Sequence, residues 1–186
     1  MTVIAILLVV VVVGWVVTAY NRLVGLGRRA DSAWADIDAQ LKRRHDLVPP
    51  LVEVVGGYAA HERTTLEEVV RLRTEARALD GDAGSEAAVR ESLLAGSLRQ
   101  LFALSEAYPD LLASDRFAHL QHQLAEIEER LQNARRYYNA VVRDLNTAVQ
   151  RFPDLLIART FGFAQRNYFE LDSALEREVV KVDLDA

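Results

Sequence analysis

The sequence contains no cysteine, and its two lysines are Lys42 and Lys181. The lack of cysteine excludes disulfide scaffolds, zinc fingers, iron–sulfur proteins and thiol enzymes, all of which need that side chain. Neither lysine follows a glycine, so the phosphate-binding Walker A loop is excluded too. The formal net charge of -5 argues against a protein that coats nucleic acid, and we predict no nucleic-acid partner.

The motifs of metal-dependent helical enzymes are also missing. A carboxylate-bridged di-metal site uses Glu-x-x-His pairs, but none of the four histidines has an acidic residue three positions earlier. A zincin-like start at His61 fails because Thr65 stands where the second histidine belongs. His119 and His122 have the spacing of a metal pair, but they flank an apolar helical stripe, which favours solvated positions over a metal site.

Two further catalytic signatures give no support for an enzyme, because one is absent and the other is in the wrong context. There is no Gly-x-Ser-x-Gly elbow, and the dinucleotide-like pattern at residues 25–30 follows an apolar segment instead of a strand. We therefore predict no catalytic residue, no cofactor and no metal site, and we place an enzyme third among the functional hypotheses.

Residues 1–20 carry no charged side chain, and every charged residue lies from Arg22 onward. Twenty helical residues span ~30 Å, which is the thickness of the hydrocarbon core of a bilayer. Trp15 and Tyr20 lie toward the end of the run, where aromatic rings prefer the interface. A cleaved signal peptide is the alternative, but no basic residue precedes the run and it is long for a signal core. We predict an uncleaved transmembrane anchor.

Three arginines follow the anchor directly: Arg22, Arg28 and Arg29. The positive-inside rule then predicts that the N-terminus faces outward and that the rest of the chain is cytoplasmic. The same side chains lie at the level of anionic lipid headgroups and could attract them. We therefore predict membrane lipid as a partner, with Trp15, Tyr20 and these arginines at the interface.

The remainder of the chain has apolar residues at the three-and-four spacing of helices and no convincing strand. The anchor should continue as helix to about residue 45, with Gly25 and Gly27 as its weakest point. Pro49 and Pro50 predict a helix–helix corner, followed by a second helix over about residues 50–79. A loop at 80–85 precedes a third helix, which Ser85 would cap and which ends near Pro109.

The fourth helix should start after Ser114 or Asp115 and has the most regular pattern in the sequence. Its expected buried seam is typical of a coiled coil and comprises Phe117, Leu120, Leu124, Ile127, Leu131, Ala134, Tyr138, Val141, Leu145, Ala148 and Phe152. Pro153 stops it, and a short turn over 154–158 follows. We predict an all-α fold, in which a transmembrane anchor (1–20) continues into an antiparallel bundle of about four helices (21–158) with a C-terminal tail (159–186).

Two clusters have open interpretations. The basic residues 42–45 favour a solvated helix end, since cations suit a helix C-terminus. The aromatic residues of the tail either dock on the bundle or bind a partner, and docking is favoured because exposed aromatic clusters are rare. These residues are Phe161, Phe163, Tyr168 and Phe169. We regard the anchor as separate from the core of the bundle.

Segments along nearly the whole chain resemble one family. They are residues 20–24, 37–49, 51–52, 57–62, 106–111, 128–135, 138–139, 152–153, 161–163 and 168–169. Together they are similar to the corresponding segments of LemA family proteins. Pro50 departs from the family pattern, because a more polar residue is expected there.

The resemblance implies a bacterial single-pass membrane protein with a long antiparallel helical bundle and no known catalytic residues. It also implies a link to membrane-organelle formation in magnetic bacteria, and to membrane metalloproteases or TPM-domain proteins as partners. We predict a scaffold or adaptor in the bacterial inner membrane that forms homo-oligomers. The alternative is a protein that remodels the membrane or organises its lipids.

Overall fold

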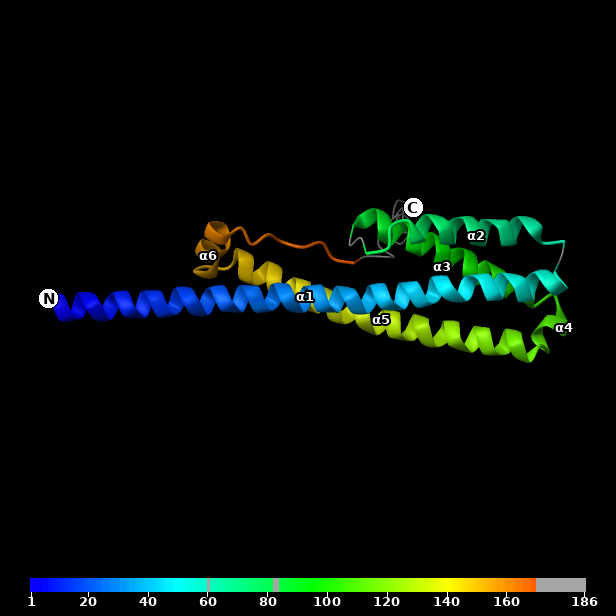
Figure 1. Ribbon diagram of the computed structural model, residues 1–186, viewed down its shortest axis with the longest axis horizontal. Helices are drawn as coiled ribbons and strands as arrows, with labels where there is room; N and C mark the ends of the chain where they lie inside the picture. Colours follow the sequence, from blue (N-terminus) through cyan, green and yellow to red (C-terminus); the bar gives the residue numbers. More distant parts are fainter. Residues whose placement is uncertain (60, 82–83, 170–186) are drawn as a thin grey trace, which may run out of the picture. The chain divides into compact units, whose positions relative to one another are not determined.

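The computed structural model of the protein describes residues 1–59, 61–81 and 84–169. Within these ranges the chain is helical without strands, which confirms the predicted all-α class. Six helices follow one another along the described part of the chain (Figure 1): α1 (Thr2–Tyr58), α2 (Arg63–Arg77), α3 (Ser85–Ser105), α4 (Pro109–Leu112), α5 (Asp115–Gln150) and α6 (Asp154–Phe161).

The chain divides into two compact units, each with its own hydrophobic core. Unit 1 consists of Met1–Ala35 and Ala134–Tyr168. Unit 2 contains Asp36–Asn133 together with Phe169, and the acidic end of the tail lies outside the described residues. Helices α1 and α5 each contribute one part to unit 1 and another to unit 2.

The core of unit 1 joins α1, α5 and α6. Its buried side chains are Ala19, Leu23, Ala30, Val141, Leu145, Ala148, Val149, Ile157 and Ala158. Trp15 and Val16 are partly buried against the same core. The expectation that the anchor contributes nothing to the core is therefore wrong for its last third. The reason is that α6 packs beside this part of α1, a contact that no local sequence pattern indicates.

The core of unit 2 is formed by α1, α2, α3, α4 and α5. Its largest fully buried apolar side chains include Leu51, Leu94, Leu101, Leu111 and Phe117. The α5 seam is buried in both units from Phe117 to Ala148, apart from Ala134, which is half-buried. Phe152 was wrongly included in that seam, because it is 74% exposed. The helix ends at Gln150, so the helical period no longer sets the direction of residue 152.

Several helix ends differ slightly from the predicted ones. Gly84, not Ser85, occupies the cap position of α3. At α5 the carbonyl of Ser114 accepts the first helical hydrogen bond from the Ala118 amide at 3.0 Å, so Ser114 has the role predicted for it or its neighbour. Helix α6 is longer than the expected turn and ends at Phe161. The residue that caps it, Gly162, has a φ of 74°, the left-handed conformation that glycine tolerates.

The predicted corner at Pro49 and Pro50 is wrong, because α1 continues through both residues to Tyr58. A proline inside a helix lacks the N–H that would bond to the carbonyl four residues earlier. For Pro49 this is the carbonyl of His45, and the Nε of Arg73 on α2 donates to it at 2.6 Å. A side chain thus replaces the missing backbone donor. The chain turns instead after Tyr58, and α2 begins at Arg63.

We predict that Arg73 stabilises the chain through this carbonyl. Arg73→Met should lower the free energy of unfolding by about 1–3 kcal/mol, because a partly buried acceptor loses its donor. In a Pro49→Ala background the same change should have a smaller effect, since residue 49 regains an N–H for the His45 carbonyl. Urea unfolding followed by circular dichroism measures both. The exposed Arg77→Met is the matched control, and equal losses from Arg73→Met in the two backgrounds would contradict the assignment.

Candidate membrane interface

The first part of α1 presents an apolar surface that no other described residue covers. Every large apolar side chain from Val3 to Val13 is at least 48% exposed. Within the described ranges, α1 is the one helix long and apolar enough to cross a membrane, and its most apolar window has a mean hydropathy of 2.8. Exposing such a surface to water is unfavourable by ~25 cal/mol per Å² of apolar area.

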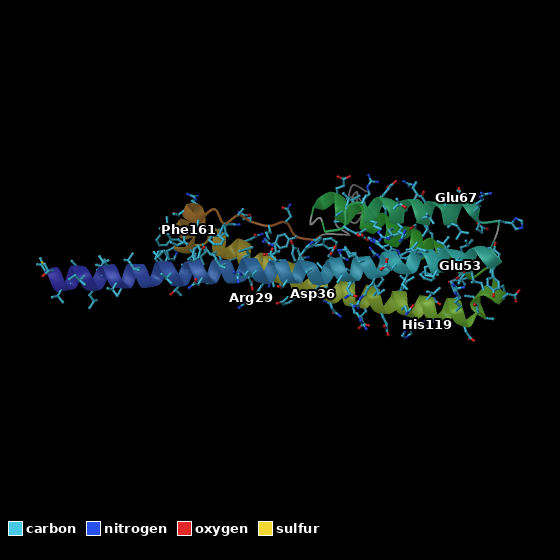
Figure 2. The ribbon with its side chains drawn as sticks, viewed as in Figure 1. Arg29, Asp36, Glu53, Glu67, His119 and Phe161 are labelled. Carbon is cyan, nitrogen blue, oxygen red and sulfur yellow. The ribbon has the colours of Figure 1, made fainter. Side chains whose placement is uncertain are left out.

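Tyr20 lies at the end of the charge-free run and contacts two aromatic residues from the C-terminal part of the chain. Its ring centroid lies 4.9 Å from that of Phe161 and 5.7 Å from that of Phe163, both edge to face. Figure 2 marks Phe161 where the C-terminal part of unit 1 lies along α1. The structure thus brings together residues that the sequence presented as two sites, an interfacial belt and a tail.

Three large apolar side chains just before and within α6 are exposed. Phe152 is 74% exposed, Leu156 51% and Phe161 54%. We call these three residues the α6 patch. Two exposed arginines, Arg151 and Arg159, lie in the same segment. The sequence pattern did not indicate Leu156, and it wrongly predicted that Phe152 would be buried. The one hint in the sequence was that Phe152 lies next to Pro153, the proline expected to end the helix.

The three arginines after the span have different environments. The Nη1 of Arg22 lies 3.1 Å from the Oδ2 of Asp154, which is 8% exposed and begins α6. This ion pair ties α1 to the first turn of α6, where a carboxylate also suits the helix dipole. Arg28 and Arg29 are exposed and, among the residues that the structure describes, make no hydrogen bond or ion pair. Arg29 is labelled on α1 in Figure 2.

The rest of the tail runs along α5 in unit 1. The Asn146 side chain exchanges two 2.9 Å hydrogen bonds with the backbone of Arg166, and the Tyr138 hydroxyl donates to the Asn167 carbonyl at 3.1 Å. Burial raises the pKa of Tyr138, so its hydroxyl keeps the proton that it donates. Of the remaining predicted tail residues, Tyr168 is 44% exposed and Phe169 is buried.

Unit 2 contains a buried charge cluster where a solvated helix end was expected. Arg44 is completely buried, and its Nη1 donates to the Glu128 carboxylate at 2.9 Å while its Nη2 donates to Glu91. The Nε2 of His45 lies 2.7 Å from Glu91 as well. The expectation for residues 42–45 is wrong for these two side chains. Because α1 does not end there, they lie in mid-helix and face α3 and α5.

The charges in this cluster stabilise one another. Burial opposes ionisation of Glu91 most strongly, yet the His45 hydrogen bond and the Arg44 charge hold the pKa of Glu91 below its usual value. Burial likewise disfavours charged Arg44, but Glu91 and Glu128 raise its pKa above the ordinary value. Arg44 and Glu91 are therefore favoured in their charged forms, and the contacts of the cluster join α1, α3 and α5.

The two histidines with metal-pair spacing are exposed on α5, as predicted for flanking positions. His122 lies 3.6 Å from Glu126, and His119 is labelled in Figure 2. Across the described ranges, no group of three or more His, Asp or Glu side chains is arranged to hold a metal.

Comparisons with known proteins agree with the resemblance seen in the sequence. The model of the LemA family matches residues 33–184. The chain is 24% identical to magnetosome protein MamQ 2 of Paramagnetospirillum magneticum, over 98% of this chain and 76% of that protein. It is 22% identical to magnetosome protein MamQ of Magnetospirillum gryphiswaldense, over 97% and 75%. Protein LemA of Metamycoplasma hominis is 23% identical, over 89% and 73%.

We predict that the charge cluster is the most sensitive polar site of unit 2. Arg44→Met should lower the free energy of unfolding by about 3–5 kcal/mol, because the buried Glu91 carboxylate loses its guanidinium partner. Combining it with Glu91→Leu should recover much of that loss, since both charges are then gone. Chemical unfolding of the full chain in detergent provides the measurement.

The neighbouring Arg43→Met is the matched control, because Arg43 is exposed one position away. It should change the stability by less than about 0.5 kcal/mol. If Arg44→Met alone is as stable as the control, the cluster does not have the structural role assigned to it.

Proposed function

This chain belongs to the LemA family, and on that premise we propose that it is a membrane-anchored scaffold or adaptor whose bundle faces the cytoplasm. The observation that carries the proposal is the exposed apolar surface of α1, which water disfavours and lipid would cover. The name of the MamQ relatives connects those proteins with the magnetosome, which supports a membrane setting for this one. A metalloprotease or TPM-domain partner rests on the resemblance and stays a prediction.

The depth of α6 follows from the length of the span. If residues 1–20 cross the ~30 Å hydrocarbon core, Trp15 and Tyr20 lie near its boundary with the headgroups. Phe161 contacts Tyr20, so α6 then lies at the same boundary. The α6 patch would enter the interfacial layer while Arg151 and Arg159 stay among the headgroups, as amphipathic membrane-surface segments do. Unit 1 would therefore be fixed to the bilayer at two points.

We expect the N-terminus outside and the bundle in the cytoplasm. Because the chain has no cysteine, single cysteines at Thr2 and at the exposed Ala125 report each side without background. An impermeant maleimide should label Thr2→Cys in intact spheroplasts and Ala125→Cys only after lysis. Changing Arg22, Arg28 and Arg29 to Gln should give mixed labelling, because they dominate the charge bias near the span.

A control variant with three other arginines changed tests whether the orientation depends on where the charges lie or on the total charge of the chain. Arg63, Arg77 and Arg99 are exposed and lie far from the span in sequence. Changing these three to Gln should leave the labelling pattern unchanged. Labelling of Ala125→Cys in intact spheroplasts would reverse the proposed orientation.

We also expect the protein to associate with itself in the membrane. Tethering gives all copies one orientation in one plane and raises their effective concentration. Helices α2 and α3 offer exposed aliphatic side chains for lengthwise contacts, namely Val70 (43% exposed), Val89 (52%) and Leu93 (44%). Contacts of this kind either close into rings or extend as arrays. A scaffold role follows from such an assembly, and an adaptor role does not need it.

The size of the protein in mild detergent, measured by light scattering over a range of concentrations, tests the assembly. We expect oligomers for the wild type and a shift toward monomer for the double change Val89→Gln and Leu93→Gln. The control Leu112→Gln alters a leucine of similar exposure (47%) on α4 and should leave the size unchanged. A monomer at every concentration would end the self-assembly proposal and leave the adaptor role.

A further inference from the structure

A polar pocket of about 420 Å³ lies in unit 1 directly after the apolar run. The α1 residues that line it are Asn21, Arg22, Gly25, Leu26 and Arg29, and α5 contributes Asp144 and Thr147. The pocket shares no residue with the buried charge cluster of unit 2. Its α1 residues lie between one and nine positions beyond Tyr20, so the pocket is close to the end of the proposed membrane span.

The two walls of the pocket have opposite hydrogen-bonding character. On α1, the guanidinium groups of Arg22 and Arg29 can only donate, and Arg22 already shares its charge with Asp154. Arg29 makes no ion pair or hydrogen bond within the described part of the chain, so its charge is available to an anion.

On α5, the wall accepts hydrogen bonds. The Asp144 carboxylate is 66% exposed, and its contact with Arg143 is a loose 4.0 Å. The Thr147 hydroxyl donates its proton to the Arg143 carbonyl at 2.8 Å, so its oxygen remains as an acceptor. A simple anion would meet Arg29 favourably but would be repelled by Asp144. A group with an anionic and a cationic end would satisfy both walls.

The depth of the pocket indicates where such a group would come from. Residues 21–25 rise only ~7 Å beyond Tyr20, within the headgroup layer of a bilayer whose core residues 1–20 span. Arg29 lies one turn farther along α1, but side chains on a helix lean toward its N-terminus, which here is the membrane side. The pocket would therefore lie among lipid headgroups.

We propose that this pocket binds the phosphoethanolamine headgroup of a membrane lipid, with the phosphate at Arg29 and the primary ammonium at Asp144 and Thr147. The inference rests on the proposed membrane anchoring, which sets the depth of the pocket. Gly25 leaves the space open: a Cβ at this position would meet no atom within 4 Å. A larger side chain at this lining position would start without a clash at its Cβ and would take up pocket space.

The test uses the full chain reconstituted in bilayers that contain phosphatidylethanolamine, phosphatidylglycerol and phosphatidylcholine in equal amounts. After gentle extraction, mass spectrometry quantifies the lipids that stay with the protein. Phosphatidylethanolamine should be enriched about fivefold over the bilayer ratio. Gly25→Leu and Arg29→Gln should abolish the enrichment. Asp144→Asn should remove the preference for phosphatidylethanolamine over phosphatidylglycerol.

Two matched variants separate the pocket from general effects of helix and charge. Gly27→Leu places the same side chain two residues away, where a Cβ also meets nothing within 4 Å and where no pocket wall lies. Arg28→Gln removes the same charge next to Arg29 without touching the pocket. Both should keep the enrichment. Equal loss in these controls and in the pocket variants would overturn the proposal.

Other outcomes are equally decisive. Enrichment of phosphatidylglycerol over phosphatidylethanolamine in the wild type, or no enrichment, overturns the proposal. Saturable binding of free phosphoethanolamine in pure phosphatidylcholine bilayers, together with no enrichment of phosphatidylethanolamine from the mixed bilayers, would identify a soluble ligand instead of a lipid. Resistance to carbonate extraction reports anchoring independently. A wild type that is anchored but shows no enrichment refutes the headgroup site alone, whereas a wild type that is extracted refutes the proposed function.

Discussion

The hydrogen bond from Arg73 to the His45 carbonyl is the interaction on which much of unit 2 depends. An interior proline costs a helix ~3 kcal/mol, partly because a carbonyl loses its donor. Arg73 supplies a donor from α2 at 2.6 Å, and α1 runs on past Pro49 to Tyr58. Had α1 ended at the prolines, Val54 and Val55 would not continue its buried face in the core of unit 2.

The same continuity explains why Arg44 and His45 are buried. In mid-helix they face α3 and α5, and a buried guanidinium is tolerated only with a counter-charge. Glu91 and Glu128 provide it, and Glu91 also accepts from His45. Such a cluster adds little net stability, because desolvation offsets most of the attraction. We expect it to disfavour other registers of α3 against α1, because Glu91 would then be buried without the Arg44 guanidinium.

The fold class and the buried face of α5 could be predicted from the sequence, because both depend on a local period repeated over many residues. Leu124 and Leu131 are buried where the three-and-four spacing places them. The errors came from partners that are distant along the chain. Arg73 lies 28 residues from the carbonyl it bonds, and Asp154 lies 132 residues from Arg22. No local rule for proline or for basic clusters contains such information.

In the candidate interface, too, some features could be predicted from the local sequence, whereas others depend on contacts between distant residues. The apolar run and the three arginines after it are local signals, and they indicate a membrane and its headgroups without further help. The sequence gives no sign that acceptors on α5 lie opposite donors on α1, because Asp144 and Arg29 become neighbours only when the helices pack. The arginines alone would indicate only an affinity for some anionic surface. In the proposed site, cations that face a carboxylate favour a headgroup with both charges, so the packing of α5 on α1 would turn a general attraction to lipid into a chemical preference.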